Sequence, residues 1–180
     1  MGIMKIETRY LIFLIFISTI VRLIIAPLYI SEPGIPFDFP RYEYVGRLVA
    51  EGKTIYTDYN DTYHYSPSNY PPLMSLTFGF WVGSLNASYI ALKILVILID
   101  VASVIVIFYI VKNLKDIKTA FIIGLLYSLS YATLISSAVT GNDDNLFLFF
   151  MLTSLYFTIK KKPNITLSAI FLSISLGFKF

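Results

Sequence analysis

The sequence has no cysteine and few charged residues. Disulfides, thiolate metal sites and thiol nucleophiles are therefore excluded. Charged residues make up 14% of the 180 positions, hydrophobic residues make up 57%, and the mean hydropathy is +0.73. A typical soluble domain carries about 25% charged residues. The composition indicates that a lipid bilayer is the solvent of this chain.

Several common functional motifs are also missing. The sequence contains no glycine-rich phosphate loop, zinc motif, nucleophile elbow or internal repeat. Its net charge of +3 is typical of a membrane protein whose lysines hold cytoplasmic loops in place. We therefore expect no nucleic-acid partner, and any catalysis must use oxygen and nitrogen groups.

Apolar stretches dominate what remains. A helix needs about 20 apolar residues to cross the hydrocarbon layer, and the chain has five stretches near that length. The predicted spans are residues 10–30, 88–111, 118–139, 145–159 and 165–178. The last two are short enough to need bilayer thinning or burial among neighbours. The first exceeds a signal-peptide core and precedes no small-residue cleavage site, so we interpret it as a retained anchor.

Lysine and arginine predict the orientation of these spans, because cytoplasmic loops collect them. They precede the first span and join the second to the third and the fourth to the fifth: Lys5, Arg9, Lys112, Lys115, Lys118, Lys160, Lys161 and Lys162. The opposite regions, 31–87 and 140–144, carry acidic residues instead. We therefore predict a cytoplasmic N-terminus and an outer loop 31–87, in the cell membrane or, in a eukaryote, the endoplasmic reticulum.

The outer loop is too long for a simple connection and is therefore expected to be functional. Within it, Tyr42 to Ala50 has the periodicity of a short amphipathic helix that ends at Gly52. The apolar stretch 73–85 is too short to cross, and a crossing would put the later lysines outside. We predict a re-entrant or juxtamembrane helix there, and an all-α polytopic membrane protein with a single domain over residues 1–180.

Acidic residues in the outward regions suit either a role in catalysis or ligand binding, or a structural role in helix capping or ion pairing. Asp38 lies just beyond the first span, where a carboxylate can act as a base toward an acceptor hydroxyl, cap the following helix or pair with Arg41. Asp143 and Asp144 form an acidic turn that suits a divalent cation or a donor. Equally, either aspartate can cap the fourth span. The sequence leaves the metal requirement open and names no cofactor.

Ionisable residues inside the spans need partners or water, because a charge in lipid costs several kcal/mol. Arg22, Lys93 and Lys179 lie toward the outer ends of their spans, where cations can hold a lipid phosphate. The alternative for Lys93 is snorkelling to the headgroups. Asp100 lies near the middle of its span, and Arg22 is its best partner; that pair would be structural.

The outer loop is rich in tyrosine and contains the one histidine of the chain. Tyr42, Tyr70 and His64 are candidates for contact with a sugar or another acceptor. Tyrosine rings stack on sugars, but an aromatic belt at the membrane interface explains them equally well. His64 alone cannot form a metal site.

The order of these features resembles the C-type superfamily of membrane glycosyltransferases, especially its polyprenyl-phosphate-mannose-dependent branch. The resemblance runs along most of the chain, through Asp38, Tyr42, Gly46-Arg47-Leu48, Glu51-Gly52-Lys53, Ile55-Tyr56, Tyr70-Pro71-Pro72-Leu73, Asp100, the turn from Gly141 to Leu146, and Leu176-Gly177-Phe178-Lys179.

The resemblance implies inverting transfer of a sugar, with mannose favoured, from a polyprenyl-phosphate carrier to an acceptor on the outer or lumenal face. Asp38 matches the catalytic base, Asp144 the second acidic turn, and Lys179 a cation for the departing phosphate. Arg22, Lys93 and Arg41 are further candidates for binding the donor phosphate. Members of the superfamily are much longer, so we expect this chain to be an amino-terminal portion, with membrane lipid and a second polypeptide that supplies further spans as partners.

Two other classes fit parts of the sequence. In a transporter or channel-like subunit, Arg22, Lys93 and Asp100 would line a polar path. The sequence shows no inverted repeat and no pair of broken core helices, which counts against that class. In a noncatalytic subunit, the same architecture would pack against another membrane protein.

Overall fold

The computed structural model describes residues 5–29, 39–55, 71–78, 80–81, 85 and 89–179. These residues contain helices and no strand, so the all-α prediction is confirmed. In chain order the elements are α1 (Ile6–Ile25), η1 (Ala26–Tyr29), α2 (Phe39–Ala50), α3 (Pro72–Phe78), α4 (Tyr89–Leu114), α5 (Ile117–Ser128), α6 (Tyr131–Leu134), η3 (Ile135–Thr140), α7 (Asp144–Ile159) and α8 (Ile165–Lys179).

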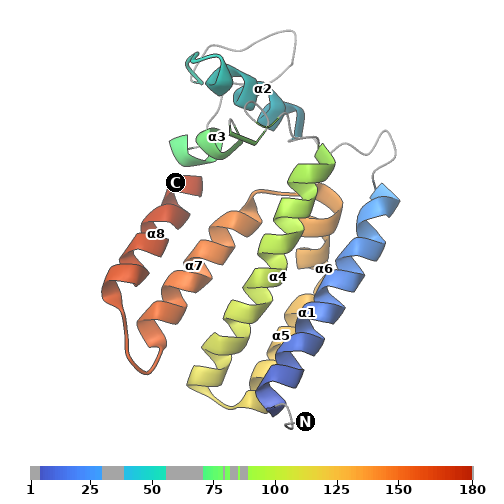
Figure 1. The fold of residues 1–180 in the computed structure, drawn as a ribbon, viewed down its shortest axis with the longest axis vertical. Helices are drawn as coiled ribbons and strands as arrows, with labels where there is room; N and C mark the ends of the chain where they lie inside the picture. The colour runs from blue at the N-terminus through green and yellow to red at the C-terminus, as the bar shows by residue number, and fades with distance from the viewer. Residues whose placement is uncertain are drawn as a thin grey trace.

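The long helices run side by side in alternating directions (Figure 1). The central helix is α4, which packs against α1, α5 and α7, while α8 packs against α7 at the edge. The N-terminus and the α4–α5 and α7–α8 connections lie at one end of this bundle. The other end, which we call the distal end, carries α2 and α3, and α3 contacts α8. The three lysine-bearing regions therefore share the end away from α2 and α3.

Among the described residues, two helices are long and apolar enough to cross a membrane, Ile6–Ile25 and Ile90–Leu114. A third crossing exists if Ile117–Ser128 and Tyr131–Thr140, which meet at a 51° bend, count as one span. The apolar helices α7 and α8 have 16 and 15 residues. At 1.5 Å per residue they reach about 24 and 22 Å, short of a hydrocarbon core of about 30 Å. The prediction of five spans is therefore confirmed only for two helices, or three with the bent pair.

The bend is a correction to the predicted continuous span 118–139. No proline or glycine lies between α5 and α6, so the usual breakers are missing. Side-chain donors reach the carbonyls on both sides of the break. The Thr133 hydroxyl lies 2.9 Å from the Tyr127 carbonyl and 3.0 Å from the Ser130 carbonyl, and Arg22 donates to the Ser128 carbonyl at 3.1 Å. Hydroxyl and guanidinium groups thus stabilise a bend that hydropathy alone does not reveal.

The structure has short helices at both places where the sequence predicts them in region 31–87, and their described bounds differ from the predicted ones. The predicted helix 42–50 is confirmed; it begins earlier, at Phe39, and is followed by Gly52 in the left-handed region at φ 67°. The helix α3 begins at Pro72, where proline is favoured, and ends at Phe78. Phe80 and Trp81 are helical as well, and the Leu85 amide donates to the Phe80 carbonyl at 3.1 Å, so the described residues bear out the predicted helix 73–85 in part.

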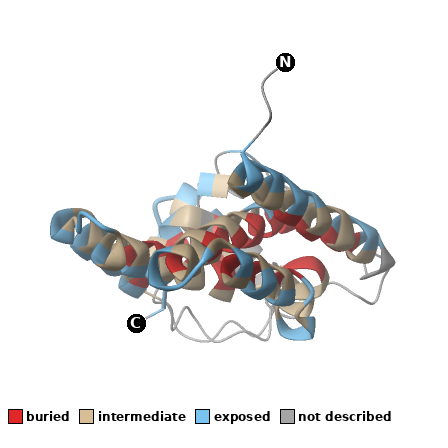
Figure 2. Cartoon of the chain, turned by 90° about the horizontal axis from the view of Figure 1, so that it is seen from below, coloured by how far each residue is buried: buried red, intermediate tan, exposed pale blue. Residues whose placement is uncertain are grey.

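The residues coloured as buried lie mainly on the sides of the helices that face one another, and the exposed residues lie mainly on the outward sides (Figure 2). At the distal end one cluster joins α3, α4, α7 and α8 through Met74, Leu92, Val96, Leu146 and Phe178. There α3 lies so close to α8 that a Cβ on Gly177 would lie 3.0 Å from Leu73 Cδ2. This packing fixes the distal ends of α7 and α8 beneath α3.

Candidate functional site

The predicted pair of Arg22 and Asp100 is confirmed. Arg22 Nε lies 2.7 Å and Nη2 2.6 Å from Asp100 Oδ2, and both side chains are fully buried. A buried charge needs a partner with good geometry, and these contacts supply it.

Neighbouring groups complete the surroundings of this pair. Arg22 Nη1 donates to the Ser18 hydroxyl at 2.6 Å and to the Ser128 carbonyl at 3.1 Å. The Tyr127 hydroxyl donates to Asp100 Oδ1 at 2.8 Å. Because the guanidinium is enclosed by α1, α4 and α5, the structure favours the structural pair over a role for Arg22 in binding lipid phosphate.

Lys93 is buried near the distal ends of α1 and α4, with 2% of its surface exposed. Its ammonium donates to the carbonyl of Ala26, the residue at which α1 passes into η1, at 3.2 Å. It also lines a cavity of about 160 Å³ together with Leu23 and Pro27 of the first helical segment and Ile90 of α4. Lys93 thus supports the end of α1 and faces an apolar cavity.

Asp144 and Lys179 form an ion pair at the distal end. Asp144 is the first residue of α7 and Lys179 the last of α8, so antiparallel packing brings together residues 35 positions apart. The pair is half exposed, at 48% and 35%. The sequence identified both residues separately but not their contact.

Two asparagines organise the turn that carries Asp144. Asn145 Nδ2 donates to Ser136 Oγ at 2.9 Å and to the Asn142 carbonyl at 3.1 Å, and Asn142 Nδ2 donates to Asp144 Oδ2 at 3.3 Å. Sequence reasoning missed both, although amides beside acidic residues in a turn are the signal for such bonds.

The turn corrects the prediction that Asp143 or Asp144 caps the fourth span. Asp143 occupies the N-cap position of α7, but its side chain makes no capping hydrogen bond. Asp144 is the first helical residue rather than the cap; its carboxylate is near the positive end of the helix dipole. Within the described part of the chain no group of three or more His, Asp or Glu residues is placed to hold a metal ion.

Several predicted site residues cannot be compared with the structure. Asp38, His64 and Tyr70 lie outside the described residues, and Arg41 and Tyr42 are described only as part of the α2 backbone. In sequence, Asp38 immediately precedes Phe39, the first residue of α2. The helix that follows Asp38 therefore lies at the same end of the bundle as Asp144 and Lys179 (Figure 1).

The C-terminal end of α2 carries a second, exposed ion pair. Lys53 Nζ lies 2.6 Å from Glu51 Oε2. The hydrogen bond and charge of Lys53 lower the pKa of Glu51, and those of Glu51 raise the pKa of Lys53. A cavity of about 340 Å³ lies beside it, between α2 and α3, with Gly52, Ile55 and Leu76 in its lining.

Comparison with known proteins adds no assignment. No family model, no curated protein and no solved structure matches the chain.

Proposed function

We propose that this chain takes part in sugar transfer from a polyprenyl-phosphate-linked donor to an acceptor on the outer or lumenal face of a membrane. Mannose is the favoured sugar. One observation carries the proposal: an acid–cation pair, Asp144 and Lys179, forms at the end of the bundle that also carries the helix following Asp38. A reaction on a lipid-bound donor needs its charged groups at such an end, level with the headgroups.

The proposal includes a topology. The bundle crosses the membrane five times, through α1, α4, the bent α5–α6–η3 segment, α7 and α8, with the lysine-bearing end in the cytoplasm. The short α8 is covered distally by α3 and α7 packs against α8, so in this topology neither needs to reach the full width of the hydrocarbon layer. Loop 31–87 then lies outside, with α2 and α3 at the interface.

The chemistry assigns separate tasks to three residues. Asp38 removes the proton from the acceptor hydroxyl while the hydroxyl oxygen attacks the anomeric carbon. The bond between that carbon and the phosphate oxygen breaks, and the configuration inverts. Lys179 stabilises the negative charge on the departing lipid phosphate, and Asp144 holds the Lys179 ammonium in position before the donor arrives.

The buried pair counts against a transporter. A polar path would need Arg22 or Asp100 to border an open space, whereas both are fully buried. Neither residue lines any of the three cavities described for the structure.

The decisive test uses native membranes that contain the chain and labelled polyprenyl-phosphate mannose. Sugar transfer should be lost in Asp38→Asn and retained in Asp58→Asn, a matched change of another acidic residue in the same loop. Lys179→Gln should lower the turnover number by about 10² to 10³, as for loss of one electrostatic stabiliser, and Lys179→Arg should restore part of it. Equal transfer by wild type and Asp38→Asn would refute the proposed function.

A further inference from the structure

Basic residues gather at the end of the bundle away from α2 and α3, which we call the lysine-bearing end. Three parts of the chain lie there: the start of α1, the α4–α5 turn and the α7–α8 turn (Figure 1). The cations among their described residues are Lys5, Arg9, Lys112, Lys115, Lys118, Lys160, Lys161 and Lys162. The acidic residues of the same three parts are Glu7 and Asp116. Eight cations against two acids give this end an excess of six positive charges, whereas the whole chain carries +3.

Both acidic residues of this end already have structural tasks. Glu7 Oε1 lies 2.5 Å from Lys112 Nζ and joins α1 to α4. The Asp116 carboxylate accepts hydrogen bonds from the Lys118 and Thr119 amides as the N-cap of α5. The α7–α8 turn contains three lysines and no acidic residue. The positive charge of the two turns is therefore only partly compensated within the described part of the chain.

Aromatic rings lie about one helical turn inside these charges. The Lys112 ammonium lies 5.5 Å from the centre of the Tyr109 ring, and the Lys160 ammonium lies 4.4 Å from the centre of the Phe157 ring. The ring centres of Tyr109 and Tyr156 are 6.2 Å apart. Because these tyrosines belong to α4 and α7, their contact makes the α4–α5 and α7–α8 turns neighbours. Tyrosine beside lysine is typical of the level of a membrane where hydrocarbon gives way to headgroups.

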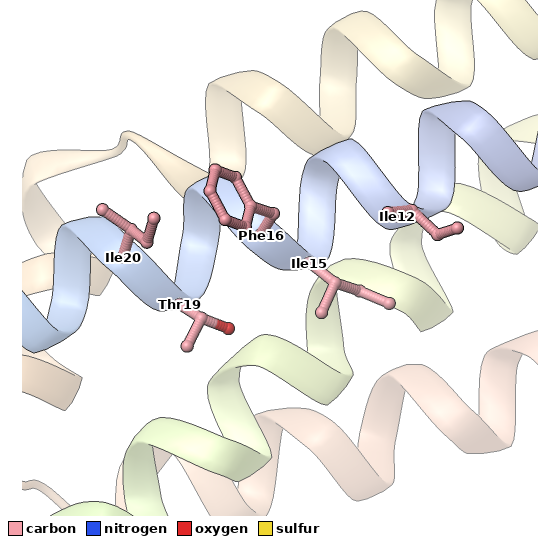
Figure 3. A pocket seen from close by; sticks show the side chains of 5 residues that line it. All are labelled: Ile12, Ile15, Phe16, Thr19 and Ile20. Atoms are coloured by element: carbon pink, nitrogen blue, oxygen red, sulfur yellow. The ribbon is translucent and has the colours of Figure 1, made fainter.

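The order of residues along α1 indicates the same level. Charged residues lie at its start, Tyr10 follows, and apolar side chains come next. Figure 3 shows these apolar side chains together with one threonine, where they line a cavity of about 490 Å³ on α1. The lining residues are Ile12, Ile15, Phe16, Thr19 and Ile20. Such a surface suits lipid tails, so the cations before Tyr10 lie at the height of the headgroups.

We propose that the lysine-bearing end binds anionic phospholipids, with their phosphates at the neighbouring α4–α5 and α7–α8 turns. Lysine ammonium groups attract an anionic headgroup and donate charge-assisted hydrogen bonds to its phosphate oxygens. An acidic protein would meet the same charges, but the aromatic and apolar surface directly inside them matches the glycerol and tails of a lipid. The proposal is separate from sugar transfer, because it uses none of the residues assigned to that reaction.

Quenching of tryptophan fluorescence by brominated lipid tests this binding. The full chain is placed in nanodiscs of phosphatidylcholine and phosphatidylglycerol, and the acyl chains of either lipid carry bromine in turn. Both leaflets have the same composition, so the result does not depend on orientation. The reporter is Leu155→Trp, on an exposed position of α7 close to the lysine-bearing end, combined with Trp81→Phe. Native Trp81, which packs at the distal end, is the matched reporter.

We expect the Leu155→Trp reporter to prefer phosphatidylglycerol over phosphatidylcholine by at least about fivefold, the effect of roughly one lysine at a charged surface. The preference at Trp81 should be smaller. Raising the ionic strength from about 0.1 M to about 1 M shortens the screening length from about 10 Å to about 3 Å and should weaken the preference. Equal preference at both reporters, or a preference that salt does not change, would overturn the proposal.

Substitutions in the α7–α8 turn separate charge from folding. Replacing Lys160, Lys161 and Lys162 together by glutamine should lower the preference at the Leu155→Trp reporter by more than half, whereas replacing all three by arginine should keep it. The matched control is Lys53→Gln, which removes an exposed lysine at the distal end and should change nothing. Unchanged preference in the glutamine variant, or an equal loss in the arginine variant, would refute the assignment.

Two further measurements identify the ligand. Potassium phosphate and potassium chloride at equal ionic strength should weaken the preference equally; a larger loss in phosphate would show that the turns bind free phosphate instead. A polyglutamate peptide, added at a carboxylate concentration equal to that of phosphatidylglycerol, should leave the quenching unchanged. Displacement of the lipid by this peptide would identify an acidic protein as the partner and overturn the proposal. Because these assays contain no sugar donor, their outcome leaves the proposed function untouched.

Discussion

Replacing Asp100 by asparagine removes one half of the buried ion pair while nearly preserving volume. The Arg22 guanidinium then stays charged, because arginine does not lose its proton in proteins. It loses the contacts of 2.7 and 2.6 Å to the carboxylate and keeps those to the Ser18 hydroxyl and the Ser128 carbonyl. The variant therefore tests the cost of an incompletely compensated buried charge.

The structure sets the expected magnitude. Breaking a buried pair from one side costs about 3–5 kcal/mol, and an arginine at a membrane helix centre costs about 2.5–3.5 kcal/mol on insertion scales. Because the Ser18 hydroxyl and the Ser128 carbonyl still accept hydrogen bonds from the guanidinium, we expect the free energy of unfolding to fall by about 3 kcal/mol, near the lower limit of these ranges. That is roughly a 150-fold change in the ratio of folded to unfolded chain.

A double-mutant cycle isolates the pair. The free energy of unfolding is measured in mixed micelles for Asp100→Asn, Arg22→Gln and the double variant. Each single variant leaves a charge behind, whereas the double variant leaves two neutral amides that can hydrogen-bond, so it should be no less stable than either single variant. A coupling free energy below about 0.5 kcal/mol would show that the ion pair does not stabilise the bundle.

Three further changes test local features. Gly52→Ala should destabilise the end of α2 by about 1–2 kcal/mol, because φ is 67° there; unchanged thermal stability would contradict this. Asp116 caps α5, and the hydrogen bond from the Thr119 amide lowers the pKa of its carboxyl below the ordinary 3.8. The cap therefore stabilises α5 fully above pH 3.8, and this stabilisation is lost as the pH falls through the lowered pKa. Amide exchange at Thr119 should show this loss, and Asp116→Asn should show no such pH dependence. Ser154→Ala removes a 2.8 Å hydrogen bond to the Ser168 carbonyl between α7 and α8 and should lower the free energy of unfolding by about 0.6 kcal/mol; unchanged or increased stability would contradict this.

Hydropathy predicted the helical fold because apolar stretches place the backbone in lipid, where its N–H and C=O groups must be hydrogen-bonded within the segment. The Arg22–Asp100 pair was predictable for a related reason: a charge inside a span needs a partner, and few candidates exist. The bend after Ser128 was not predictable, since it depends on Arg22 reaching a carbonyl 106 positions away. No local pattern around residue 128 contains that information.

The candidate site was predicted residue by residue but not as an arrangement. Asp144 and Lys179 were each singled out by position, whereas their contact depends on α7 and α8 ending at the same level. Asn142 and Asn145 were missed because their hydrogen bonds organise a turn whose geometry begins with Gly141 in the left-handed region, at φ 61°. Composition identifies charged groups, and only packing determines which of them meet.

At the distal end α8 packs against both α7 and α3. In Figure 1 both α7 and α8 end below the distal end of α4, and α3 lies above α8. The contact of Leu73 with Gly177 requires the small residue, because a Cβ there would lie 3.0 Å from Leu73 Cδ2. Lys179 follows Gly177 by two positions in α8, and its charge meets Asp144 of α7. The proposed phosphate-binding cation, Lys179, is thus held where α3, α7 and α8 come together.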